Sequence, residues 1–205
     1  MRRSGTPTKG DLREQKILET LEELLAGKTF EALTINDLAE GAGLSRASLY
    51  FYFGSKQDAL VALFAKTVEV LREKSRAAAE EPTASREAIA KVMARTRDQW
   101  LDHGLIMRVA IDQSAAVPEL DALWTETADI FIDAITAVLI NAGVPDNDQP
   151  DGARAMAQAL CWMIERTFYR ASAVSPDELR RASETCLEIW LRAAASGGGT
   201  SGSGG

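Results

Sequence analysis

Apolar residues recur at helical spacing along this chain, and no segment alternates apolar and polar residues as a strand would. The first helical segment opens at Asp11 and Glu14, which form a D-x-x-E start signal. Apolar side chains then follow at intervals of four, three and one residues from Ile17 to Leu25, and Gly27 ends the pattern. The spacing predicts an all-α fold.

Capping residues, glycine and proline divide the rest of the chain into further helices. Pro82 and Pro118 each end a helical pattern, and His103-Gly104 separates two others. We expect about nine helices, at 11–26, 35–42, 46–51, 55–81, 85–103, 105–117, 119–142, 152–173 and 176–195.

The composition is that of an ordinary globular chain, with 205 residues of which 46% are hydrophobic. Its two cysteines, Cys161 and Cys186, form no CxxC motif, so we expect neither a disulfide framework nor a metal site. Every apolar run is shorter than the roughly 18 residues that a membrane span needs. Polar residues follow Met1-Arg2-Arg3, which predicts no secretory signal. These features together predict a cytoplasmic protein.

The net charge of −7 is unevenly distributed. Residues 1–60 carry 8 basic and 9 acidic side chains, whereas residues 61–205 carry 15 and 21. The segment from Ser45 to Lys56 contains Arg46 and Lys56 and no acid. The charge balance therefore neither establishes nor excludes binding to nucleic acid.

The pattern divides the chain into three parts. Residues 1–60 form an expected three-helix head with a helix-turn-helix, and residues 61–195 form a larger helical domain. Residues 196–205 contain only Gly, Ser and Thr, which is the composition of a flexible tail.

The segment from Thr34 to Gln57 has the features of a DNA-reading helix-turn-helix. Two short helices join at Ala42-Gly43-Leu44, and small side chains on the second would let it approach base edges. Arg46 could reach a guanine or a phosphate, and hydroxyls at the helix N-termini could bind phosphates. The predicted DNA contacts are Thr34, Ser45, Arg46, Ala47, Ser48, Tyr50, Tyr52 and Lys56.

At these residues the chain resembles the TetR family of transcriptional regulators. The shared pattern runs from Thr34 and Ala39 through Ala42-Gly-Leu-Ser45 to Leu49-Tyr50-x-Tyr52-Phe53-x-Ser55-Lys56. Leu123-Trp124 and Glu165-Arg166-Thr167 are similar to the EthR branch of the family. The resemblance implies a homodimer that binds a palindromic DNA operator and is released by a small apolar effector. It also places the ligand and the dimer contact in the C-terminal domain, with the last two helices forming a four-helix interface. Ala47 and Phe51 are less polar than the residues that many members have there, so base specificity stays open.

The large apolar and aromatic residues of the C-terminal domain are the candidate pocket lining. Such residues at helical spacing are usually core, but the resemblance implies a cavity between helices. Trp124 and Phe131 share one helix face. On a later helix, a second face is shared by Cys161, Ile164, Glu165 and Phe168. The predicted ligand contacts are Trp100, Met107, Trp124, Ala128, Phe131, Cys161, Ile164, Glu165 and Phe168. Trp190 could face either the pocket or the dimer seam.

Glu165 and Arg166 are adjacent charges on an otherwise apolar helix. They could form an ion pair or a solvated edge, or one could provide the polar group of the pocket. His103 is the only histidine and precedes Gly104 at an expected helix end, which favours a capping role. Without a nucleophile, base and acid set, we expect neither an enzyme nor a bound cofactor.

Two other functions remain open on the sequence alone. The chain could be an all-α carrier or enzyme that contains a helical hairpin by coincidence. Alternatively, it could bind DNA and use its C-terminal domain only to dimerise.

Overall fold

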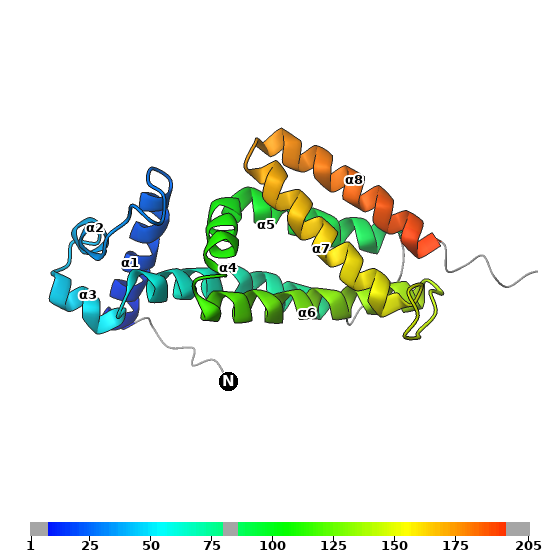
Figure 1. Ribbon diagram of the computed structural model, residues 1–205, viewed down its shortest axis with the longest axis horizontal. Coiled ribbons are helices and arrows are strands. Elements are labelled where there is room, and N and C mark those ends of the chain that lie inside the picture. Colours follow the sequence, from blue (N-terminus) through cyan, green and yellow to red (C-terminus); the bar gives the residue numbers. More distant parts are fainter. Residues whose placement is uncertain (1–7, 80–85, 196–205) are drawn as a thin grey trace, which may run out of the picture.

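The computed structural model describes residues 8–79 and 86–195, and all regular structure within these ranges is helical. Figure 1 shows a small head of three helices joined by a long helix to a larger helical body. The eight helices are α1 (Lys9–Leu25), α2 (Ile35–Gly41), α3 (Arg46–Tyr52), α4 (Lys56–Ala79), α5 (Arg86–Gln113), α6 (Pro118–Asn141), α7 (Ala153–Ser172) and α8 (Pro176–Ala195). The all-α prediction is confirmed.

Capping residues start the three helices of the head. The Thr8 hydroxyl accepts the amide of Asp11, whose carboxylate accepts the amide of Thr8, and Thr34 and Asp37 repeat this reciprocal pair at α2. The turn between α2 and α3 passes through Gly43 with φ of 67°, a conformation that costs other residues about 1 kcal/mol or more. The head therefore forms the turn that the glycine predicted.

The core of the head is built from the apolar stripe that the first helix presents. Ile17 and Leu21 of α1 are buried with Leu38 of α2 and Leu49 of α3. Burying each such side chain contributes roughly 1.5–3 kcal/mol, which fixes the two short helices on the longer one. The opposite side of α3 is left facing solvent.

The body stacks its helices in layers. α4 continues directly from the head and lies against α6, while α7 and α8 form a hairpin that packs over α5 (Figure 1). Buried side chains from all five helices form one continuous apolar core with the head. The expected boundary at residue 60 falls inside α4, so head and body share one continuous helix.

The expected break at His103-Gly104 is a kink, and this is why the structure has eight helices where about nine were expected. His103 has non-helical φ and ψ of −128° and 16°, but α5 continues to Gln113. A side chain at Gly104 would stand only 3.3 Å from Cβ of Ser172, so the glycine permits close contact with α7. Glycine here reflects packing and does not end the helix.

Some expectations fall outside the described residues. These are the basic residues Arg2 and Arg3, the expected end of the fourth helix at Pro82, the start of the fifth at Ser85, and the tail at 196–205. Within the described ranges, no helix is long and apolar enough to cross a membrane.

A helix-turn-helix face and an apolar pocket

The solvent face of α3 carries a compact set of side chains available to a partner. Arg46, Ala47, Tyr50 and Phe51 are all exposed, and their spacing places them on one side of the helix. Arg46 donates to the Tyr50 hydroxyl at 3.2 Å, and its guanidinium lies 5.5 Å from the centre of the Tyr50 ring. Among the described residues Arg46 forms no ion pair with a carboxylate, and its side chain is exposed to solvent.

Phe51 is the most exposed large apolar side chain of the described residues, at 84%. Its ring meets the half-buried Tyr52 edge-on, with ring centres 5.4 Å apart. Phe51 was not among the predicted DNA contacts, because the sequence suggested only that it weakens polar readout. Its exposure adds an apolar contact to this face of α3.

The hydroxyl groups at the starts of α2 and α3 form capping hydrogen bonds within their own helices. Ser45 accepts the amide of Ser48 at 3.1 Å, and the two hydroxyls lie 2.9 Å apart. Thr34 donates to Asp37 at 2.8 Å. Hydrogen bonds from Thr34, followed by the hydrogen bond and charge of Lys28, lower the pKa of Asp37 to about 2. These groups cap α2 and α3, and Lys28 ties α2 to the loop after α1.

Lys56 lies inside the head. Its ammonium donates to the carbonyls of Phe30, Glu31 and Leu33 at 2.7, 3.1 and 2.7 Å. It also lies 4.8 Å from the centre of the Phe30 ring. All three ammonium protons are used, so the structure places Lys56 as a tie between α4 and the loop after α1.

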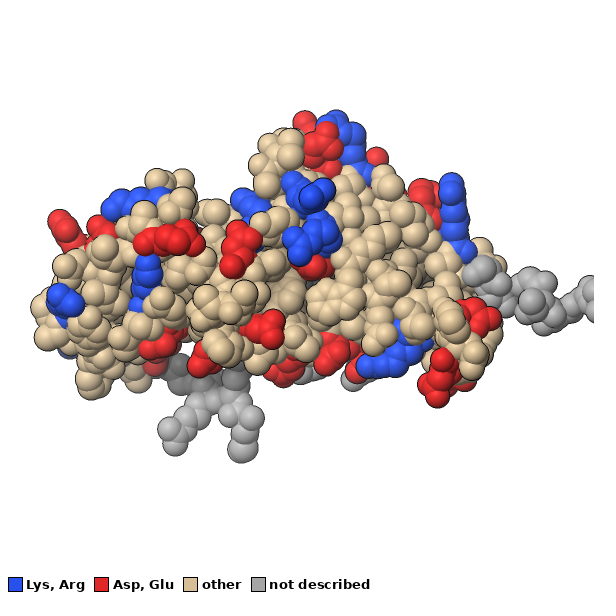
Figure 2. All heavy atoms as spheres, viewed as in Figure 1, with Lys and Arg blue, Asp and Glu red and all other residues tan. Residues whose placement is uncertain are grey.

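Charge on the head is mixed, with basic and acidic side chains in nearly equal number. On the face seen in Figure 2, isolated basic and acidic side chains are interspersed over both head and body, without a broad basic surface.

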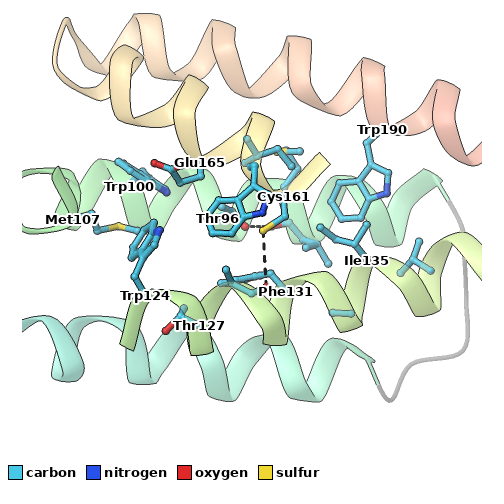
Figure 3. A pocket seen from close by; sticks show the side chains of 17 residues that line it. Thr96, Trp100, Met107, Trp124, Thr127, Phe131, Ile135, Cys161, Glu165 and Trp190 are labelled. Carbon is cyan, nitrogen blue, oxygen red and sulfur yellow. Dashed lines mark hydrogen bonds between the residues drawn. The ribbon is translucent and has the colours of Figure 1, made fainter. Parts of the chain in front are cut away.

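The body contains a cavity of about 90 Å³ between α5, α6, α7 and α8. This is several times the roughly 10–15 Å³ that one water molecule needs. Figure 3 shows its lining, in which aromatic and aliphatic side chains predominate. The lining residues are Val92, Met93, Thr96, Trp100, Met107, Trp124, Thr127, Ala128, Phe131, Ala134, Ile135, Val138, Cys161, Trp162, Ile164, Glu165 and Trp190.

The polar groups of the lining differ in whether they have partners. Thr96 and Thr127 donate their hydroxyls to carbonyls of their own helices, and the Cys161 thiol lies 3.9 Å from the Ala128 carbonyl. Burial raises the pKa of Cys161 to about 12, which keeps the thiol protonated and unreactive. By contrast, Glu165 Oε1 and Trp190 Nε1 are buried without a hydrogen-bond partner.

Comparison with known proteins finds a family match for the head and another for the body. Residues 17–63 match the family model "Bacterial regulatory proteins, tetR family", and residues 85–195 match "Transcriptional regulator EthR, C-terminal domain". The chain belongs to the TetR family. It is an EthR-like transcriptional regulator.

Individual proteins agree with this assignment. The HTH-type transcriptional regulator EthR of Mycolicibacterium smegmatis is 33% identical over 198 residues, covering 93% of this chain and 89% of the relative. EthR of Mycobacterium tuberculosis is 31% identical over 201 residues, covering 93% and 90%. A solved structure of Thermus thermophilus FadR, described as a TetR-family repressor in complex with lauroyl-CoA, has a TM-score of 0.63 at 17% identity. That alignment covers 88% of this chain and 94% of FadR and shows a shared fold.

The structure of this TetR-family regulator brings together eight of the nine residues predicted for the pocket. The exception, Phe168, is fully buried and packs edge-on against Trp100, with ring centres 6.3 Å apart. Phe168 therefore packs against a lining residue without lining the cavity itself. Trp190 lines the pocket, so the indole side chain belongs to the cavity rather than to an external seam.

Several residues that line the pocket were not among the ligand contacts predicted from the sequence. Val92, Met93 and Thr96 lie on the first half of α5, whose relation to α6 and α7 depends on the tertiary fold. The regular apolar spacing of α5 was visible, but spacing alone does not separate a pocket wall from the core.

The side chains of Glu165 and Arg166 lie in different surroundings. Glu165 faces the cavity, whereas the exposed Arg166 lies 5.0 Å from the centre of the Tyr169 ring. Burial raises the pKa of Glu165, and the charge of Arg166 opposes this effect only in part. Glu165 is therefore the carboxyl group that the pocket presents, together with the unpartnered N–H of Trp190.

Proposed function

We propose that this protein is a ligand-responsive repressor, in which α3 binds a DNA operator and a small, mostly apolar molecule in the pocket releases it. The observation that carries the proposal is the combination, in one TetR-family chain, of an exposed α3 face and an apolar cavity in the body. A carrier would have no use for the exposed face of α3, and a simple dimerisation domain would have no use for the cavity.

DNA recognition is assigned to the exposed side of α3. Arg46 is placed to bind a guanine edge or a phosphate, and Tyr50 orients it through their hydrogen bond. Ala47 and Phe51 supply apolar contacts of the kind that the methyl group of thymine accepts. Thr34, Ser45, Ser48 and Tyr52 hold or flank this surface, and the amides at the helix N-termini are available to phosphates. We assign Lys56 to stabilising the head, because its ammonium is fully used there.

The active form is proposed to be a homodimer built on α7 and α8, as the family resemblance implies. Trp162 and Ile189 expose 43% and 40% of their side chains on these helices, and Ala159 and Thr185 flank them on exposed positions. An isologous contact would cover these apolar surfaces. Ile164, Phe168 and Trp190 are buried within each protomer and take no part in it.

Release of DNA follows from the continuity of α4. This helix begins four residues after α3 ends and packs along α6, which contributes Trp124, Ala128 and Phe131 to the pocket. A ligand that separates α6 from α5 and α7 would shift α4 and with it the DNA-reading head. Because dimer heads must match half-sites ~34–36 Å apart, a small rotation weakens one of the two contacts.

The direct test starts from an operator selected from random DNA with the purified protein. Fluorescence anisotropy then measures operator affinity for wild type, Arg46→Ala and Tyr50→Phe. We expect Arg46→Ala to weaken binding by about 1–3 kcal/mol and to reduce its salt dependence. If no sequence is enriched, or if folded Arg46→Ala binds as wild type does, α3 is not the DNA-reading element.

Ligand response is tested on the same operator. Compounds that raise the melting temperature of the protein, as a native-state ligand must, are added to the preformed complex. Release of the operator supports the repressor function. Stabilisation by a ligand without any change in operator affinity would leave a DNA-binding protein whose cavity has another role.

A further inference from the structure

Two of the polar atoms that line the pocket have no partner. Among the described residues, only three buried side-chain nitrogen or oxygen atoms lack a hydrogen bond, and two of them, Glu165 Oε1 and Trp190 Nε1, line this cavity. Trp190 is only 2% exposed, so solvent does not satisfy its indole N–H. An unsatisfied buried polar group costs free energy, so both atoms mark places where a ligand could gain a hydrogen bond.

Glu165 also lacks a cation. Its neighbour Arg166 is directed to the Tyr169 ring on the outside of α7, and the described residues that line the cavity include no Lys, Arg or His. Burial raises the pKa of Glu165, and the charge of the adjacent Arg166, which does not line the cavity, offsets this only in part. The pocket therefore offers one acid and no base.

The surroundings of Glu165 suit a positive charge. Five aromatic side chains line the cavity: Trp100, Trp124, Phe131, Trp162 and Trp190. In Figure 3, Glu165 lies in the same half of the cavity as Trp100, Met107 and Trp124. An aromatic face attracts a nearby cation, and tryptophan does so most strongly. The carboxylate and the faces of the neighbouring rings can therefore attract the same ammonium group.

Trp190 distinguishes the two ends of the cavity. Figure 3 places it beside Ile135, away from Glu165, and its N–H can only donate. An ammonium group is also only a donor, so it finds no hydrogen-bond partner at that end. Along α6 the lining extends from Trp124 to Val138, which is roughly 21 Å at the rise of an α-helix. The lining thus suits a long apolar body with its charged end at Glu165.

We propose that the pocket binds a lipophilic amine, with the ammonium group on Glu165 and the hydrocarbon body along α6 toward Trp190. This inference rests on the proposed function and names the chemical class of its effector. A fatty acid of the same length could accept one hydrogen bond from Trp190 Nε1, but its charge would find no Lys, Arg or His among the described lining residues at that end and would meet Glu165 at the other. A neutral alcohol would gain one hydrogen bond at Glu165 but no charge attraction.

The test compares three probes with the same ten-carbon chain on the free protein, without DNA. Isothermal titration at pH 7.5 measures the affinity of n-decylamine, n-decanol and n-decanoate, each below the concentration at which it aggregates. We expect the amine to bind at least about tenfold more tightly than either of the others, because the buried charge pair forms only with the amine. Equal affinity for amine and decanoate, or no amine binding, would overturn the assignment.

A matched pair of variants locates the charge. Glu165→Gln should remove most of the advantage of the amine over decanol, whereas Glu184→Gln on the exposed side of α8 should retain it. This control matters because the whole chain is acidic and could attract amines non-specifically. Retention of the full amine preference in Glu165→Gln would also overturn the assignment. If Glu165→Gln does not fold, the ranking of the three probes on wild type decides alone.

Operator release separates this inference from the proposed function. Decylamine that binds the free protein without releasing DNA would support the ligand class and contradict the repressor mechanism. Release by decanol or decanoate, but not by decylamine, would support the mechanism and overturn the ligand class.

Discussion

Gln113, at the C-terminal end of α5, donates its side-chain amide to Glu31 Oε1 at 2.6 Å. Glu31 lies in the loop after α1, and its backbone carbonyl is one of the three that bind the Lys56 ammonium. The same α5 carries Trp100 and Met107 in the pocket wall. The pocket and the DNA-binding head are therefore linked through α5 as well as through α4.

We predict that Gln113→Ala weakens the coupling between ligand and operator. The substitution removes the side-chain contact with Glu31 but touches neither α3 nor the cavity lining. Operator affinity without ligand should stay near that of wild type, while the shift caused by a saturating ligand should fall by about two- to tenfold. Anisotropy titrations with and without ligand measure the shift. The exposed Gln149→Ala, in the loop between α6 and α7, is the matched control, and equal shifts in both variants would assign the coupling to α4 alone.

Lys56→Met should destabilise the protein without altering its electrostatic attraction to DNA. The substitution removes this donor from three carbonyls, two of them partly buried, and we expect the free energy of unfolding to fall by about 1–3 kcal/mol. Urea denaturation followed by circular dichroism measures this loss. Below the unfolding transition, the slope of log affinity against log salt should match wild type. A slope reduced by about one, as expected for Arg46→Ala, would show that Lys56 contacts a phosphate after all.

Glu165→Met should stabilise the protein at neutral pH. The folded chain holds Glu165 with a raised pKa, whereas the unfolded chain ionises near the ordinary value of 4.5. As pH rises above about 4.5, the unfolded state releases this proton first, so the carboxyl group destabilises the fold. The gain from Glu165→Met should therefore be present at pH 7, decline as the pH falls toward 4.5, and be lost below that value. A gain in melting temperature that is the same at pH 4 and pH 7 would mean that ionisation of Glu165 is not its cause.

How far the sequence predicted the structure depends on the range of the interactions. The caps at Thr34 and Ser45 and the turn at Gly43 involve neighbours within a few residues, and all three were predicted correctly. Helix-breaking signals were less decisive. His103 leaves helical geometry as its position suggested, but hydrogen bonds and packing on both sides carry α5 through the kink.

Interactions between distant segments were beyond pattern analysis. The DNA contact of Lys56 stays a prediction, but its position before a helix gave no sign that its ammonium binds carbonyls 23 to 26 residues earlier. Phe168 lies seven residues after Cys161 and shares its side of α7, but the ring of Trp100 on α5 separates it from the cavity. Periodicity gives the face of a helix, whereas only the packing of the other helices decides what that face contacts.

Ile189→Asp should break the proposed dimer. Ile189 is 40% exposed on α8, so a single protomer tolerates a carboxylate there at small cost in stability. In an isologous interface the same change introduces two charges into an apolar contact. Light scattering after gel filtration should show monomers, and operator affinity should fall steeply. Leu12→Asp, on the exposed side of α1, is the control and should remain dimeric. A dimeric Ile189→Asp protein would place the interface elsewhere.

Ala128→Trp should fill the pocket and remove its response to ligand. Ala128 lies in the middle of the α6 wall, is 6% exposed, and directs its carbonyl toward Cys161 on α7. A Trp side chain there would occupy much of the 90 Å³ cavity and cost about 1–3 kcal/mol of stability through overpacking. We expect ligand affinity to fall at least about tenfold and operator affinity to become independent of ligand. Ala122→Trp makes the same change at an exposed position of α6 and should retain the wild-type response. Titrations of operator with and without ligand compare the three proteins. If Ala128→Trp binds operator and responds to ligand as Ala122→Trp does, this cavity does not control DNA binding.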